Sequence, residues 1–84
     1  MRVSFNERYF AEYDRDSHYV HEPVPMTYQT FIINNEKYFQ LDCYSKAIII
    51  DDIGPSIQSK HKLQFGEEEA KEFISLLKKE FGFQ

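Results

Sequence analysis

The chain has 84 residues, of which 42% are hydrophobic and 29% are charged, so it is expected to fold rather than to stay disordered. This length fits one α+β domain, residues 1–84, because two separate cores would each be too small to fold without disulfides or metals. A formal net charge of −4 without a basic block makes nucleic acid an unfavoured partner, although it does not exclude one.

The first residues carry signals for a short helix. Ser4 and Glu7 have the spacing of a capping box. Phe5, Tyr9 and Tyr13 would share one face of such a helix. The same aromatic residues also suit a strand, so both structures stay open, with the helix favoured.

A β-hairpin is predicted in the middle of the chain. Residues 27–33 are rich in β-branched and aromatic side chains, and residues 37–43 alternate between apolar and polar ones. Residues 34–36, Asn-Asn-Glu, can form the turn between them. The preceding residues 20–26 contain two prolines and are expected to form an extended loop or an edge segment.

Two further strands are predicted after the hairpin. Residues 47–53 form a β-branched run that ends at a Gly-Pro turn, either continuing the previous strand or turning back at residues 44–46. Residues 57–65 alternate strictly, which is typical of a half-buried strand. No connection is long enough for a crossover helix, so the strands should pair in antiparallel order.

The last predicted element is an amphipathic helix over residues 67–81. Its apolar residues recur at helical spacing: Ala70, Phe73, Ile74, Leu77 and Phe81. Glutamates fill its first turn and lysines its last, and Gly82 can end it in a left-handed conformation.

These elements predict an α+β fold: a small antiparallel meander of three to four strands, with the C-terminal helix on one face and a short N-terminal helix as an option. In architecture alone, this order resembles a single-stranded DNA-binding coactivator fold and several small phage-encoded inhibitors. No motif in the sequence carries that resemblance to the level of a family.

The expected compartment is the cytoplasm. Cys43 is the only cysteine, so the chain cannot form an internal disulfide. The N-terminus becomes charged before an apolar signal segment can develop, and no apolar run reaches the length of a membrane span. We therefore expect no membrane association.

Three candidate catalytic or metal sites have simpler structural explanations. His18, His21 and Glu22 lack the further ligands, at a recognised spacing, that a zinc site needs. Cys43 falls on the apolar side of its strand, where a thiol usually packs as a small apolar group. Asp51 and Asp52 suit a turn before Gly-Pro, and neighbours on a strand point to opposite faces. We expect no catalytic residue, cofactor or metal.

A second set of aromatic residues predicts a binding surface. One helix can cover one sheet face, so the side opposite Phe39 and Leu41 is expected to stay open. The residues predicted to bind a partner are Tyr28, Tyr38, Tyr44 and Asp42 on this side, together with Asp51 and Asp52 as acidic groups that could meet a basic surface. Two alternatives remain: residues 1–22 could fold over this face, or it could form a homodimer.

The function expected from these features is a non-catalytic protein-binding module. It would occupy a surface of a larger protein, with a basic, nucleic-acid-processing protein as one candidate partner, in the manner of a phage or mobile-element inhibitor or a small regulatory subunit. The alternative is a single-stranded nucleic-acid binder that stacks bases on the tyrosines and holds phosphates with Lys37, Lys46, Lys60 and Lys62. A small metal-dependent enzyme ranks third.

Overall fold

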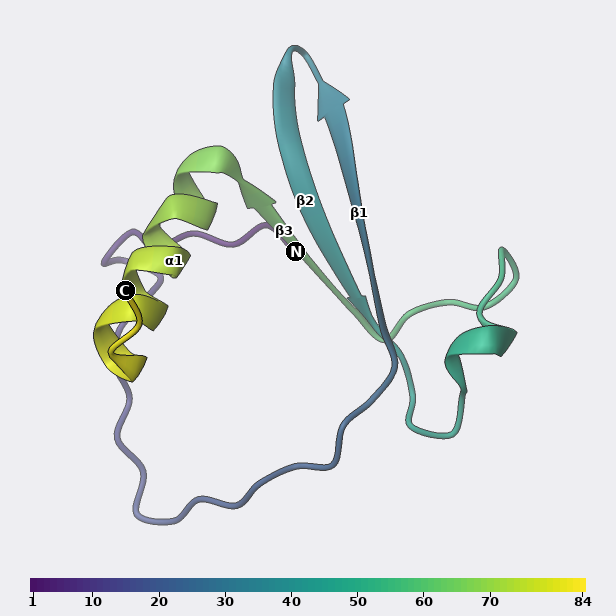
Figure 1. Ribbon diagram of the computed structural model, residues 1–84, viewed down its shortest axis with the longest axis horizontal. Coiled ribbons are helices and arrows are strands. Elements are labelled where there is room, and N and C mark those ends of the chain that lie inside the picture. The colour runs from purple at the N-terminus through teal and green to yellow at the C-terminus, as the bar shows by residue number, and fades with distance from the viewer.

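The computed structural model describes residues 1–84 and contains one sheet and one α-helix (Figure 1). The elements in chain order are β1 (Met26–Ile33), β2 (Glu36–Cys43), the 3₁₀-helix η1 (Ile50–Asp52), β3 (His61–Gly66) and α1 (Glu67–Phe81). The three strands lie in the order β1-β2-β3, and both pairings are antiparallel. The predicted α+β class, antiparallel meander and C-terminal helix are thus confirmed.

The turn of the hairpin contains two residues. Asn34 and Asn35 have φ angles of 53° and 65°, which is the left-handed region that a type I′ turn requires and that asparagine tolerates well. Ile33 therefore faces Glu36, and this pair sets the register of the whole hairpin. The prediction had included Glu36 in the turn, and this difference of one residue matters for the site.

The helix α1 has the ends that its sequence predicts. At its start the Gly66 N–H donates a hydrogen bond to Glu69 Oε1 at 3.2 Å, which satisfies one free backbone donor. At its end Gly82 has a φ of 74°, and its N–H donates to the carbonyl of Lys78 at 2.8 Å. With 15 residues, α1 is neither long nor apolar enough to cross a membrane.

The N-terminal helix suggested by the sequence is not formed. Ser4 Oγ accepts a hydrogen bond from the Asn6 N–H at 3.3 Å, and Asn6 Oδ1 accepts one from the Arg8 N–H at 2.9 Å. These hydrogen bonds between residues two positions apart stabilise a turn, and they occupy the Ser4 side chain that would otherwise cap a helix. Phe5 instead stacks on Phe73 of α1 with 5.8 Å between ring centroids, so tertiary packing draws this segment away from a local helix.

The fourth strand predicted over residues 47–53 is not formed either. Instead, the Asp52 N–H donates to the carbonyl of Ile49 at 3.0 Å, which belongs to η1. A β-branched run forms a strand only where a neighbouring strand pairs with its backbone N–H and C=O groups. Residues 47–53 have no neighbouring strand. The strand predicted over residues 57–65 begins only at His61. Its predicted first residue, Ile57, belongs to a turn, because its N–H donates to the Gly54 carbonyl at 3.0 Å.

The N-terminus pairs with the outer edge of β3. The Gln64 N–H donates to the Met1 carbonyl and the Val3 N–H donates to the Gln64 carbonyl, both at 2.8 Å. This short parallel bridge covers the edge of β3, whereas residues 6–22 are exposed and run away from the sheet (Figure 1). Apart from Arg2, whose guanidinium lies over the Tyr38 ring, residues 1–22 therefore do not cover a sheet face.

The fold is unusually open for its length. Its accessible surface is 7812 Å², whereas a folded monomer of this size should expose about 5,300 Å². Its radius of gyration is 15.3 Å, against about 12 Å for a compact chain of this length. Four residues are buried, namely Gln40, Tyr44, Phe65 and Gly66, and no side chain is fully buried. Much apolar surface is left for contact with another molecule.

Candidate functional site

The register places the predicted tyrosines on different sides of the sheet. Tyr28 lies opposite Leu41, and its ring stacks on Phe39 at 5.5 Å, so it belongs to the side that carries α1. Tyr38 lies opposite Phe31, with which it stacks at 5.7 Å on the far side. The expectation of one shared tyrosine surface is wrong, because directly opposed residues of an antiparallel pair share a face.

Tyr44 belongs to the interior rather than to a free surface. Its side chain is 7% exposed. Its N–H donates to the Pro25 carbonyl at 3.0 Å, and its hydroxyl lies 3.2 Å from Thr27 Oγ1. These contacts tie the end of β2 to the start of β1, so Tyr44 stabilises the hairpin and is not available as an anchor for a partner.

The predicted acidic residues do not gather around the tyrosines. Asp42 Oδ1 accepts a hydrogen bond from Gln40 Nε2 at 2.8 Å on the far side of the sheet. Asp51 and Asp52 are exposed in η1, in the loop that projects beyond the sheet end (Figure 1). These three carboxylates therefore form no common site with Tyr28.

An apolar groove lies between the sheet and α1, and we call it the helix-side groove. It has a volume of about 300 Å³, and every lining residue is hydrophobic: Phe39, Leu41, Phe65, Ala70, Phe73 and Ile74. An adjoining hollow of about 400 Å³ is lined in part by the charged residues Lys37 and Glu67. On β1, Tyr28 and Ile32 extend the apolar surface and are 72% and 69% exposed.

The groove stays open because α1 packs chiefly against β3 and leans away from the hairpin (Figure 1). A helix is about 10 Å wide, whereas three strands at a spacing of about 4.8 Å need more cover than that. The groove was not predicted from the sequence, because the helix-bearing face was expected to be closed. The mismatch between one helix and three strands was the available signal.

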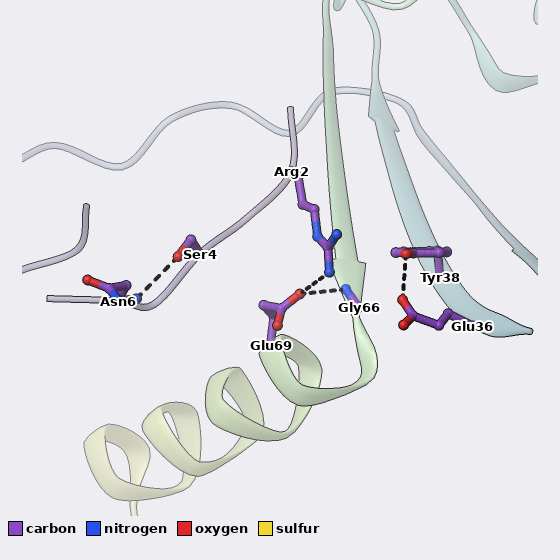
Figure 2. Close-up of polar contacts among 7 residues, drawn as sticks. All are labelled: Arg2, Ser4, Asn6, Glu36, Tyr38, Gly66 and Glu69. Carbon is purple, nitrogen blue, oxygen red and sulfur yellow. Dashed lines mark hydrogen bonds and ion pairs between the residues drawn. The ribbon is translucent and has the colours of Figure 1, made fainter. Parts of the chain in front are cut away.

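The far side of the sheet is polar and partly covered. Gln64 Nε2 donates to Gln40 Oε1, and Gln40 Nε2 donates to Asp42 Oδ1, each at 2.8 Å. Next to this ladder, the Arg2 guanidinium lies 5.2 Å from the centre of the Tyr38 ring. Figure 2 shows the Arg2 guanidinium and the Gly66 N–H both donating to the Glu69 carboxylate. It also shows the Tyr38 hydroxyl donating to the Glu36 carboxylate. Near the turn, Phe31, Ile33 and Tyr38 line a smaller hollow of about 230 Å³ on this side, together with Arg2 and Gln64.

The Tyr38 hydroxyl donates a hydrogen bond to Glu36 at 2.8 Å, which raises the pKa of Tyr38 above its ordinary value, while Arg2 opposes the rise. The folded chain thus holds this proton more tightly than the unfolded chain. The resulting stabilisation is present below a pH of about 10 and is lost as the pH rises through the folded pKa.

We predict that Glu36→Ala lowers the pKa of Tyr38 towards its ordinary value. Carbon NMR of ring-labelled tyrosine across an alkaline titration measures this pKa separately from those of the other tyrosines. Glu68→Ala is the control, because Glu68 is exposed and contacts Lys71 rather than Tyr38. An equal pKa for Tyr38 in the wild type and Glu36→Ala would contradict the role of this bond.

The histidines and the cysteine do not assemble into a metal site. No group of three His, Cys, Asp or Glu side chains has a suitable arrangement for an ion. His18 Nε2 lies 3.1 Å from the Arg15 carbonyl, and the His21 ring lies 4.4 Å from that of Tyr19. Cys43 is a half-buried free thiol.

The lysines proposed to hold phosphates are dispersed. Lys37 lies at the mouth of the hollow beside the groove, whereas Lys62 lies opposite Asp42 on the far side. Lys46 Nζ is 3.5 Å from Glu22 Oε2 in an exposed ion pair. The basic strip that a nucleic-acid strand would follow is therefore not assembled on the side of Tyr28.

Comparisons with known proteins give no further identification. No protein-family model matches the chain, and neither a curated protein nor a solved structure matches it.

Proposed function

We propose that this chain is a non-catalytic protein-binding module that holds part of a larger protein in the helix-side groove. The supporting observation is that a groove lined only by hydrophobic residues stays open in a fold with little buried core. Open apolar surface of this kind is characteristic of interaction sites. Tyr28, stacked on Phe39 and largely exposed, is the candidate anchor beside it.

The chemistry of the rim suggests the kind of partner. Glu67 and Lys37 line the mouth of the adjoining hollow, and Glu68 and Glu69 follow Glu67 in the first turn of α1. An apolar segment with a basic residue beside it would match this arrangement, and the net charge of −4 would favour its approach. The chain would act by occupancy, as a phage or mobile-element inhibitor or a small regulatory subunit does.

The first test compares two tyrosine variants on opposite faces. A partner captured by the wild-type chain from its host is identified by mass spectrometry and purified. We predict that Tyr28→Ala weakens its binding by about 2 kcal/mol, or roughly 30-fold, as calorimetry can measure. Tyr38→Ala is the matched control, since it removes the same ring from the far face, and should bind as the wild type does.

A second variant tests the groove itself. Ile74 lines the groove from α1 and is 52% exposed, so Ile74→Glu should block an apolar ligand without disturbing a packed core. Ser75→Glu adds the same charge at the next, exposed position of the helix and should leave binding intact. If Tyr28→Ala and Ile74→Glu both bind with wild-type affinity, the groove is not the binding site.

A further inference from the structure

The outer edge of β1 is the one open edge of the sheet. The strand order β1-β2-β3 places β1 and β3 at the two edges, and Met1 to Val3 cover the edge of β3. Nothing pairs with the other side of β1, which stands at the border of the sheet in Figure 1. Its eight residues pair with β2 without interruption, so no bulge bends the edge away.

The free backbone groups of β1 belong to its even-numbered residues. The two-residue turn makes Ile33 and Glu36 a hydrogen-bonded pair, and the Tyr44 N–H donates to Pro25 at the other end. Odd-numbered residues of β1 therefore bond to β2. Tyr28, Thr30 and Ile32 direct their N–H and C=O groups to the open side.

This edge lacks the usual protection against pairing. Monomeric proteins blunt an exposed edge with charges, proline, bulges or short length. The sequence of β1, MTYQTFII, contains neither a charged residue nor a proline and spans eight residues. Its exposed apolar side chains include Tyr28, Ile32 and Ile33.

We propose that β1 pairs with β1 of a second copy of this chain, in antiparallel order about a two-fold axis at Thr30. Self-pairing opposes no like charges, because the strand carries none. The register that places Thr30 opposite its copy also places Tyr28 opposite Ile32 of the other copy, twice. Aromatic and β-branched residues are a favourable cross-strand pair on the helix side. The product is a continuous six-stranded sheet.

The surface area of the chain is consistent with such a dimer. The accessible surface of 7812 Å² exceeds the expectation for a compact monomer by roughly 2,500 Å². A stable dimer needs about 800 Å² from each copy. The dimer would use the edge of β1 and leave the residues that line the helix-side groove free. Because Tyr28 would contact both the second copy and the proposed partner, Ile74→Glu is the variant that tests partner binding alone.

The test is the mass of the full chain by sedimentation equilibrium over a wide range of concentration. We expect a reversible dimer. Thr30→Pro removes an N–H that points away from β2, so the hairpin should persist while the dimer dissociation constant rises at least about tenfold. Ile32→Lys should weaken the dimer as well. Ile49→Lys is the control: Ile49 lies in the loop and is 61% exposed, so this variant should not weaken the dimer.

A cross-link tests the register. Opposed residues of a hydrogen-bonded pair have Cα atoms about 5.5 Å apart, a spacing that a disulfide can span. In a Cys43→Ser background, Thr30→Cys should form a covalent dimer under mild oxidation, whereas Gln58→Cys in the exposed loop should not. A monomer at every concentration, a dimer unaffected by Thr30→Pro and Ile32→Lys, or a dimer without the Thr30→Cys cross-link would each overturn the proposal.

Discussion

Phe65→Ala is expected to unfold much of this protein. Phe65 is 7% exposed, stacks on Phe73 of α1 at 5.5 Å and lies opposite Phe39 of β2, so it joins the helix to the sheet. Truncation of a buried phenylalanine costs about 3–5 kcal/mol. Domains of ordinary stability have about 5–15 kcal/mol in total. An open fold with four buried residues should lie near the lower end.

Urea unfolding followed by circular dichroism measures this effect, at a single protein concentration so that self-association does not change the result. We expect a much lower midpoint, or an unfolded chain without urea. Phe81→Ala is the matched control, because Phe81 is 70% exposed at the end of α1 and its loss should matter far less. Similar midpoints for the two variants would show that Phe65 is not the centre of the core.

The sequence predicts the hairpin, the last strand and the helix because each has a strong local signal. The asparagines favour positive φ angles, the alternation of residues near Leu63 fits a strand, and the helix has matching residues at both ends. The failed predictions depend on distant partners. Residues 47–53 lack a neighbouring strand, and Phe5 leaves a local helix to stack on Phe73. Local patterns do not contain that information.

The predicted placement of Tyr28 and Tyr38 on one face was wrong because of one residue in the turn. With Asn34, Asn35 and Glu36 all in the turn, Tyr28 would face Asp42 and share a side with Tyr38. The observed turn has two residues, and Tyr28 faces Leu41 on the helix side. Since side chains alternate with a period of two, a shift of one residue moves a whole set to the other face. Turn length therefore decided which face carries Tyr28, and composition could not reveal it.

The buried amide of Gln40 shows a second feature that the strand pattern could not reveal. The alternation predicts Gln40 on an open face, yet its side chain is 8% exposed. It accepts a hydrogen bond from Gln64 and donates one to Asp42, so it connects β2 and β3 on the far side. A buried polar group that loses its partner costs about 1–3 kcal/mol, and Gln40→Ala removes the partner of two half-buried groups, the Gln64 amide and the Asp42 carboxylate.

We expect Gln40→Ala to lower the free energy of unfolding by about 2 kcal/mol, measured by urea denaturation. Gln29→Ala is the matched control, because Gln29 lies directly opposite Gln40 on β1 but is exposed, and it should change stability little. The double variant Gln40→Leu with Gln64→Leu should regain part of the loss, since neither side chain then leaves an unsatisfied amide. Equal stability of Gln40→Ala and Gln29→Ala would mean that water replaces the ladder without cost. In that event the amide ladder from Gln64 to Asp42 would contribute little to the stability of the fold.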